Sequence, residues 1–590
     1  MKQQLRSGAW ALLLVVGLPW LSYPLSWMPR SWLHFRFGCV LPIAETFLVF
    51  SLLALAALLL RPRPASDSNE QGVNLFFLRS MLLLLLAVIL SALLSTRLSA
   101  HSYLGLSQLP RLGGNAAIFL LAACATRERM RDFCKSWVIV ALIVAGNGLV
   151  RLGSEPEFIS TFGNRNFLAA YLAASVVIAI SIREMWSLWG SLLLLGSLWF
   201  CDSRGAWMAL GITALLWFVF LGDNLLRRWT ARAAVALVVL ATAGLLARPY
   251  AVRQWQTDVR PMIWKATLRM IATQPLVGHG LGAYVTEYPQ YRLPEYFLRP
   301  KATNVTDHAH NELLEITAEQ GLIGLAAVLW LWITTLGCGL RSCRRPETGQ
   351  HRFMMGLLGA TVLLMLHGMV DIDLRYPPNQ SLLWLLMGLL AGANSPATTG
   401  RFAILHSSWA RLSLATACLL LGIWVVVGAV IHPALADWQD RQARIAEERG
   451  DWEAVAQHAL DALRIQPFRP STQYLLAGAL SRLPTSQAHQ AAIEQCLRIE
   501  EIAPDYADVT FNLGQLYLAD GRAAEALPYL RRAAQSNPYD VERCLAVAAA
   551  LHNLGLVDEA QRQMEEALQR QPTNQKIKDM LQEIHRERKP

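Results

Sequence analysis

Apolar runs of bilayer-spanning length recur along the chain from about residue 9 to about residue 431. A transmembrane helix needs about 20 mainly apolar residues. The chain is also only 16% charged, whereas soluble domains carry about 25% charged residues. We therefore expect an all-α protein built on a polytopic membrane helix bundle of about 12–13 transmembrane helices. The candidate spans are 9–28, 40–60, 75–95, 113–126, 136–151, 166–182, 185–201, 205–222, 231–247, 313–340, 353–370, 380–394 and 411–431.

Basic residues are distributed unevenly between the connections of these spans. With a cytoplasmic N-terminus, the cytoplasmic connections hold clusters of arginine and lysine, and the opposite side holds single arginines. This asymmetry favours the N-inside orientation. Topology and an anionic substrate then account for the net charge of +10, so the charge requires no nucleic acid. The clusters are Arg61/Arg63, Arg127/Arg129/Arg131/Lys135, Arg227/Arg228/Arg232 and Arg341/Arg344/Arg345/Arg352.

These patterns divide the chain into four parts. We expect N-terminal transmembrane helices over 1–247, a large loop over 248–312, C-terminal transmembrane helices over 313–432 and a soluble helical domain over 433–590. The loop and the last domain both lie outside the cytoplasm in the N-inside orientation.

The last domain consists of amphipathic helices with a period near 34 residues. Small residues recur where paired helices would touch, and a proline follows each second helix. The Pro504–Pro538 and Pro538–Pro572 spacings are both 34. This pattern resembles the tetratricopeptide repeat (TPR), which forms an α-solenoid with a concave groove for a protein partner. A spacer or a stabilising cap is the alternative role.

Polar residues gather at the non-cytoplasmic ends of the helices. Each has an ordinary explanation on its own, because arginines snorkel and glycines make turns. Their shared placement on one membrane face indicates a functional site. The segments are Thr161–Asn166, Asp202–Gly205, Arg260–Trp264, Gly278–Gly282, Asp307–Asn311 and His367–Arg375.

The chemistry of this set points to a phosphate-bearing substrate. A guanidinium binds phosphate oxygens bidentately and keeps its charge. The Gly278–Gly282 stretch lacks the ending of a nucleotide-binding loop, so we interpret it as a turn that permits close backbone approach. Asp371 and Asp373 alone are a poor cage for a divalent cation. We therefore expect no metal, and arginines would neutralise the phosphate charge.

The Asp307–Asn311 segment runs directly into the apolar helix that follows. We expect Asp307 to be the N-cap of that helix. The helix dipole disfavours the charged form of His310, so its imidazole can accept a proton. Asn311 could orient the ring or a substrate hydroxyl. An interfacial histidine cluster that only caps the helix is the alternative.

The order His310-Asn311, nine residues and Gly321-Leu322-Ile323-Gly324 resembles the signature of the O-antigen ligases. These belong to a superfamily shared with O-antigen polymerases and bacterial protein O-oligosaccharyltransferases. The resemblance covers roughly residues 150–390, which would make 148–394 a ligase-like catalytic core. It also includes Phe162–Asn166, Ser203–Gly205, Arg260 with Trp264, Pro275–Gly282 and His367 with Asp371.

The resemblance implies a multi-pass enzyme of the bacterial inner membrane with a periplasmic TPR domain. It would be an inverting, metal-independent glycosyltransferase without a cofactor. The donor would be a glycan on undecaprenyl diphosphate, and the acceptor a hydroxyl of lipid A-core, a glycan or a protein. His310 would be the catalytic base, and Arg260 would hold the leaving diphosphate. The substrate-binding residues would be Arg165, Arg204, Asn164, Asn166, His308, Asn311, His279, Asp371 and Arg375.

One departure concerns Asn164-Arg165-Asn166, where many relatives have Asn-Pro-Asn. Arg165 either adds a diphosphate contact or is peculiar to this protein. A TPR domain is also foreign to the minimal ligase, so a polymerase and a protein O-oligosaccharyltransferase remain alternatives to the ligase. A transporter, such as the bicarbonate type, would place ionisable groups near mid-membrane instead of at one face.

Overall fold

The chain is 80% helical over the residues that the computed structural model describes. These are 75–123, 130–152, 157–221, 257–300, 302–344, 351–393, 408–425, 427 and 431–587. They contain 21 α-helices, three short 3-10 helices and no strand. The all-α prediction is confirmed. The candidate spans 9–28, 40–60 and 231–247 lie outside the described residues.

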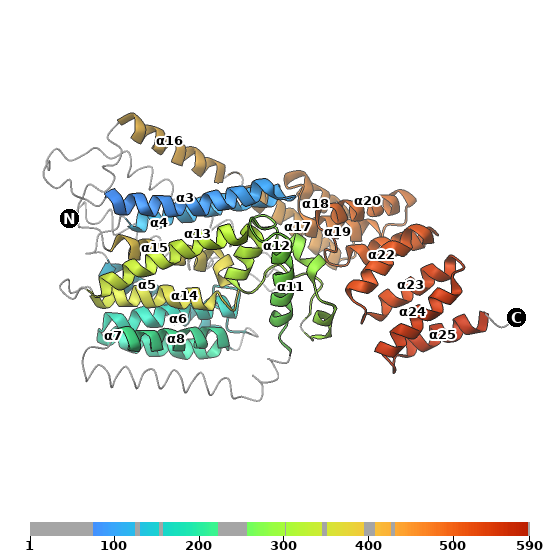
Figure 1. Ribbon diagram of the computed structural model, residues 1–590, viewed down its shortest axis with the longest axis horizontal. Coiled ribbons are helices and arrows are strands. Elements are labelled where there is room, and N and C mark those ends of the chain that lie inside the picture. The colour runs from blue at the N-terminus through green and yellow to red at the C-terminus, as the bar shows by residue number, and fades with distance from the viewer. Residues whose placement is uncertain are drawn as a thin grey trace.

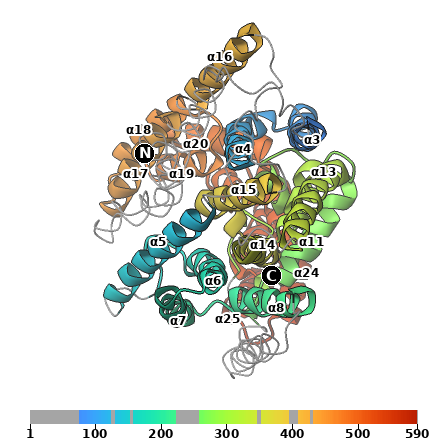
Figure 2. The same cartoon turned by 90° about the vertical axis from the view of Figure 1, so that its left-hand side faces the viewer.

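The apolar helices form a bundle at one end of the molecule, and the repeat helices form the other end (Figure 1). α6 and α14 lie at the centre of the bundle, and α14 contacts α5, α6, α8, α13 and α15 (Figure 2). The ten bundle helices are α3 (Leu75–Leu98), α4 (Ser102–Ala123), α5 (Met130–Val150), α6 (Arg165–Ile182), α7 (Met185–Phe200), α8 (Arg204–Leu221), α13 (Glu312–Cys343), α14 (His351–His367), α15 (Pro377–Gly392) and α16 (Ser408–Val425).

Three of these helices, α5, α6 and α13, are long and apolar enough to cross a membrane. Shorter apolar helices are Leu82–Leu98, α7 and α14. α6 is the most enclosed of the three spans, with 83% of its apolar window buried inside the bundle. Its alanines explain this position, because small side chains let neighbouring helices approach closely.

α4 begins 11 residues before the predicted span 113–126, at Ser102. Its first turns contain Ser107, Gln108 and Arg111, so a search for apolar residues alone misses them. These turns extend the helix toward the repeat domain, where the ring of Tyr103 stacks on Phe468 with centroids 4.3 Å apart. The first turns of α4 therefore contact the repeat domain.

The loop before α13 contains a compact helical unit. It comprises α11 (Arg260–Thr273), α12 (Tyr284–Glu287) and the 3-10 helices η4 (Tyr288–Tyr291) and η5 (Pro294–Leu298). Ile263, Met270, Tyr284 and Tyr288 form its buried core. Figure 1 shows this unit between the bundle and the repeat helices.

The glycine segment of this loop packs directly on the backbone of α13. Gly321 interrupts α13 with φ 65° and ψ −169°, and Leu322 N there donates to Pro275 O at 2.8 Å. A Cβ at Gly321 would lie 2.1 Å from Leu276 O, and one at Gly278 would lie 2.4 Å from Glu319 O. The expected close backbone approach at Gly278 is confirmed. Gly321 of the sequence signature thus joins the loop to α13, the helix that begins two residues after His310.

Gly321→Ala is expected to destabilise the protein strongly. A left-handed φ alone costs about 1–3 kcal/mol for a residue with a Cβ, and the overlap with Leu276 O adds to this cost. Gly337→Ala in the same helix is the control, because a Cβ there meets no atom within 4 Å. Thermal unfolding in detergent should show a lower melting temperature for the first variant only. Equal melting temperatures would contradict the packing role.

The repeat helices confirm the tetratricopeptide pattern. Gly450, Gly521 and Gly555 each turn the chain between paired helices with φ of 73°, 73° and 74°, and Ala526 and Ala560 are fully buried where the helices touch. The helices are α17 (His432–Glu448), α18 (Trp452–Ile465), α19 (Pro470–Leu480), α20 (Ser486–Ile502), α21 (Val509–Ala519), α22 (Ala523–Ser536), α23 (Val541–Asn553), α24 (Val557–Arg570) and α25 (Gln575–Glu587).

Candidate functional site

The segment before α13 is held in place by hydrogen bonds to three other segments. Asn311 is the N-cap of α13, since its Oδ1 accepts from Leu314 N at 3.0 Å. The expectation that Asp307 caps this helix is therefore wrong; Asp307 is exposed in the preceding loop. Asn311 Nδ2 also donates to Met369 O at 2.8 Å, and Trp264 Nε1 donates to Ala309 O at 2.9 Å.

His310 has the properties of a proton acceptor. Its Nδ1 is buried and has no hydrogen-bond partner among the described residues. Burial lowers the pKa of His310 below its ordinary value, and the positive charge of Arg260 lowers it further. The backbone of His310 adopts a left-handed φ of 53°, a conformation that is uncommon outside glycine and asparagine. The ring of His310 therefore tends to be neutral, with an Nδ1 that is free to accept a proton.

Arg260, Asp371 and Asn166 meet beside this ring. Arg260 Nη2 lies 2.9 Å from Asp371 Oδ2, and Asn166 Nδ2 donates to the same oxygen at 2.8 Å. The three residues come from the start of α11, the connection after α14 and the start of α6. Asp371 is nearly buried with 6% of its side chain exposed, whereas Arg260 keeps 28% exposed. The carboxylate fixes the guanidinium and leaves part of it open to a ligand.

Two more arginines of the predicted set begin helices at the same end of the bundle. Arg165 follows Asn164, the N-cap of α6, whose Oδ1 accepts from Asn166 N at 2.8 Å. Arg165 Nη1 lies 3.8 Å from Asp202 Oδ2. Arg204 is the first residue of α8. Helix N-termini and arginines both attract anions, so the starts of α6 and α8 add two groups that favour a negatively charged ligand.

Arg375 has a different environment from the one expected of a substrate-binding residue. Its Nη1 donates to Glu319 Oε2 at 2.9 Å and its Nε to Glu312 Oε2 at 3.0 Å, while Nε lies 3.5 Å from Glu315 Oε1. Its partners already neutralise the guanidinium and hold α13 to the connection before α15. This position indicates a structural role for Arg375.

His308 is tied to the same glutamate cluster. Its Nδ1 lies 2.7 Å from Glu315 Oε1. Burial disfavours protonation of His308, but the charge and hydrogen bond of Glu315 outweigh it, so the pKa of His308 lies above its ordinary value. The two histidines thus differ: His308 is paired and tends to be charged, and His310 is unpaired and tends to be neutral.

The glutamates of this cluster were not among the residues predicted from sequence. Their spacing is the signal that could have found them, because Glu312, Glu315 and Glu319 lie on one face of a helix. Carboxylates on one face of an otherwise apolar helix indicate a partner of opposite charge, which here is Arg375.

His279 lies away from Arg260. Its Nε2 is 3.0 Å from Met270 O and 3.1 Å from Thr273 Oγ1, at the opposite end of the 14-residue helix α11. With a rise of about 1.5 Å per residue, that end is roughly 15 Å or more from Arg260. The backbone of His279 supports α13, since its N–H donates to Ala318 O at 2.9 Å. These contacts indicate a structural role for His279.

A second buried histidine supports the Asp371 connection. His367 Nδ1 lies 2.9 Å from Asp373 Oδ1, and both side chains are almost completely buried. Gly205 at the start of α8 packs against this ring, because a Cβ there would lie 3.3 Å from His367 Nε2. The His367 carbonyl accepts from Asp371 N at 3.1 Å. The pair therefore holds the backbone from which Asp371 reaches Arg260.

The family model described as O-antigen ligase matches residues 189–329, and a tetratricopeptide repeat model matches 517–584. The first range contains Arg204, Arg260, the His308–Asn311 segment and the spaced glycines. These two matches support the O-antigen ligase family with C-terminal tetratricopeptide repeats. The chain carries tetratricopeptide repeats at its C-terminus, and it is a multi-pass membrane protein. The ligase-like domain supports a function of the O-antigen ligase or polymerase type.

No curated protein sequence matches this chain. Among solved structures, it is similar to the MamA RS-1 ArsTM double mutant with 18% identity and a TM-score of 0.25, over 26% of this chain and 85% of that one. It is also similar to MamA 41-end from Desulfovibrio magneticus RS-1 with 18% identity and a TM-score of 0.24, over 25% of this chain and 82% of that one.

Proposed function

We propose that this protein transfers a glycan from undecaprenyl diphosphate to an acceptor hydroxyl on the periplasmic side of the inner membrane. The observation that carries the proposal is the meeting of Arg260, Asp371 and Asn166 near His310, whose Nδ1 has no hydrogen-bond partner among the described residues. A partly open guanidinium is suited to a diphosphate, and a buried neutral imidazole is suited to a hydroxyl proton.

In the proposed mechanism, His310 accepts the proton of the acceptor hydroxyl as the oxygen attacks the anomeric carbon. The bond to the diphosphate breaks on the opposite face of the sugar, so the configuration inverts. Arg260, fixed by Asp371, stabilises the negative charge that develops on the leaving group. Arg165 and Arg204 stand at the same end of the bundle and would assist. In this scheme arginines carry out the charge neutralisation, and no metal ion takes part.

The proposed site lies in a core of about residues 148–394, and the repeats of 433–590 would lie in the periplasm with the loop that they contact. The convergence of the charged groups at one end of the helices supports a transferase over a transporter, which needs ionisable groups near mid-membrane. A protein partner or acceptor for the repeats is consistent with their groove-forming fold.

The rate of glycan transfer is expected to stay constant near neutral pH and to fall only at a pH below 6.5. The base must be neutral, so transfer is complete above the pKa of His310 and is lost as the pH falls through it. Because burial and Arg260 lower this pKa from 6.5, the acid limb should lie below pH 6.5. Initial rates of transfer between about pH 5 and 8 measure it. An acid limb above pH 6.5 would contradict a buried neutral base.

Deletion of the gene, followed by analysis of the surface glycans, separates the branches of the family. Loss of long-chain lipopolysaccharide with accumulation of the lipid-linked glycan would support a ligase. Shortened glycan on its carrier would indicate a polymerase, and loss of protein glycosylation would indicate a protein O-oligosaccharyltransferase. Unchanged glycans in all three classes would contradict the proposed function.

A further inference from the structure

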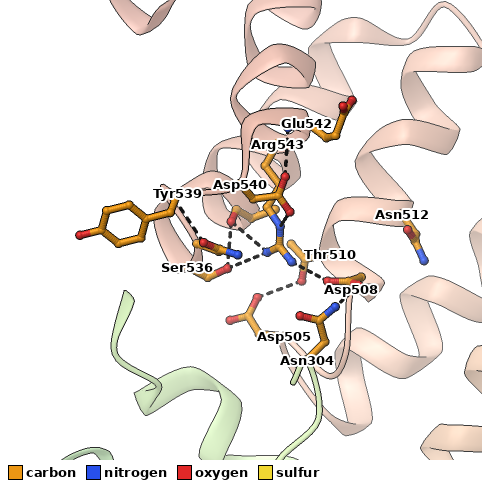
Figure 3. A network of polar contacts seen from close by, with 12 residues as sticks. Asn304, Asp505, Asp508, Thr510, Asn512, Ser536, Tyr539, Asp540, Glu542 and Arg543 are labelled. Atoms are coloured by element: carbon orange, nitrogen blue, oxygen red, sulfur yellow. Dashed lines mark hydrogen bonds and ion pairs between the residues drawn. The ribbon is translucent and has the colours of Figure 1, made fainter. Parts of the chain in front are cut away.

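The repeat domain contacts the loop before α13 at a polar junction between Asn304 and Asp508 (Figure 3). Asn304 Nδ2 donates to Asp508 Oδ2 at 2.6 Å. Asp508 is the N-cap residue of α21, in the middle of the repeat array. Asn304 stands only six residues before His310. The junction therefore joins the repeats to the segment that ends at the proposed base.

Asp508 is fixed from within the repeats by Arg543. Arg543 Nη2 donates to Asp508 Oδ1, and Arg543 Nε lies 3.3 Å from Asp540 Oδ2. Arg543 Nη1 donates to Ala533 O at 3.2 Å and to Ser536 Oγ at 3.1 Å. Only 6% of the Arg543 side chain is exposed. A buried guanidinium with this many partners has little freedom to move, so the carboxylate presented to Asn304 is held rigidly.

The loop is held from its other side by η5. The buried hydroxyl of Tyr296 accepts from Thr303 N at 3.1 Å and lies 3.4 Å from Thr306 Oγ1. Val305 packs against the hydrophobic core of the repeats. Residues 303–306 are thus clamped between η5 and the repeat array.

The segment beyond Thr306 is also anchored. Asp307 is close enough to Tyr506 that its charge adds to the effect of burial, which raises the pKa of Tyr506 to about 12. Ala309 is buried, and its N–H donates to Glu315 Oε2 at 2.8 Å. Six residues span at most about 20 Å even when extended. The segment is thus short and held at both ends, so the position of Asn304 constrains the left-handed backbone of His310.

We propose that the repeat array is a positioning element of the transfer site, in which Asp508, held by Arg543, fixes the 303–307 segment and thereby the conformation of His310. This inference rests on the proposed function for the role of His310. The repeats are then part of the enzyme's own architecture and more than a docking module for another protein.

Asn304→Asp tests the proposal without altering the repeats. The new carboxylate would face Asp508 and break the junction by repulsion. The expected result is a kcat about tenfold to a hundredfold lower, because a misplacement of about 1 Å can cost that much, with the KM for the lipid-linked donor within about twofold. Adding Asp508→Asn to this variant exchanges the two partners, so that an amide on the repeat side can donate to a carboxylate on the loop. The restored hydrogen bond should recover most of the lost kcat. Asn553→Asp, an exposed change of equal charge in α23, is the control.

Amide hydrogen exchange of the full-length protein in detergent gives a readout that is independent of activity. Peptides covering 303–311 should exchange faster in Asn304→Asp and return toward the wild-type rate in the double variant. Unchanged exchange and kcat in Asn304→Asp would overturn the proposal, and so would a loss that the double variant does not reverse. If the wild type transfers no glycan, the proposed function fails, and the exchange rates still decide whether the repeats hold this segment.

Discussion

His310→Asn is expected to reduce glycan transfer by about 10²–10⁴-fold, the range that a general base contributes. Asparagine is the informative replacement because it tolerates a left-handed φ, such as the 53° of His310, and has no basic nitrogen. The protein should therefore fold normally and lose only the proton acceptor. Transfer in membrane vesicles that contain the lipid-linked donor measures the effect. His310→Ala should lose transfer to the same extent, with the added strain of a left-handed alanine.

The controls for this prediction separate chemistry from capping. His552→Ala changes an exposed histidine at the end of α23 and should leave transfer unchanged. Melting temperatures of wild type and His310→Asn should agree within a few degrees, since a change of about 1 kcal/mol shifts a domain by only a few degrees. Near-normal transfer by His310→Asn would mean that the histidine only shapes the start of α13.

Arg260→Lys is expected to lower transfer by about 10²–10³-fold, the usual effect of removing one donor from a site that stabilises developing negative charge. A lysine keeps the positive charge but cannot contact Asp371 and a diphosphate oxygen together with one planar group. The Arg260–Asp371 distance of 2.9 Å and the 28% exposure of Arg260 show that the guanidinium already has one partner and an open side.

Arg269→Lys is the matched control for Arg260→Lys. It lies in the same helix, is exposed and undergoes the same chemical change. It should transfer glycan at the wild-type rate. Equal activity of the two variants would show that only charge at α11 matters, or that Arg260 does not contact the donor.

The sequence was sufficient to predict the fold class because its signals are long and periodic. Ten of the predicted spans coincide with helices of the bundle. The 34-residue period predicts repeats over 433–590, and the tetratricopeptide repeat model matches 517–584 within that range. The start of α4 was missed, since a helix that leaves the apolar layer to meet the repeats is no longer marked by hydropathy. The helices α11 and α12 were also missed, because hydropathy does not mark helices that lie outside the apolar layer.

The site could be predicted in part. The grouping of Arg260, Asn166 and Asp371 follows from their place at the same ends of helices, which topology alone brings together. Sequence could not distinguish an arginine that faces a ligand from one that is enclosed, so Arg375 was expected at the substrate and lies among Glu312, Glu315 and Glu319. The junction of Asn304 with Asp508 joins residues 204 positions apart and has no local pattern.

Transfer by the purified protein in liposomes with EDTA shows whether His310 and Arg260 move the glycan without a metal ion. The liposomes would contain an undecaprenyl-diphosphate-linked glycan and a hydroxyl acceptor, and the measurement is the amount of carrier released against the amount of glycan transferred. We expect release and transfer in equal amounts by the wild type, and both reduced by at least about 10²-fold in His310→Asn and Arg260→Lys. Absence of carrier release by the wild type, or undiminished transfer by either variant, would contradict the proposed mechanism.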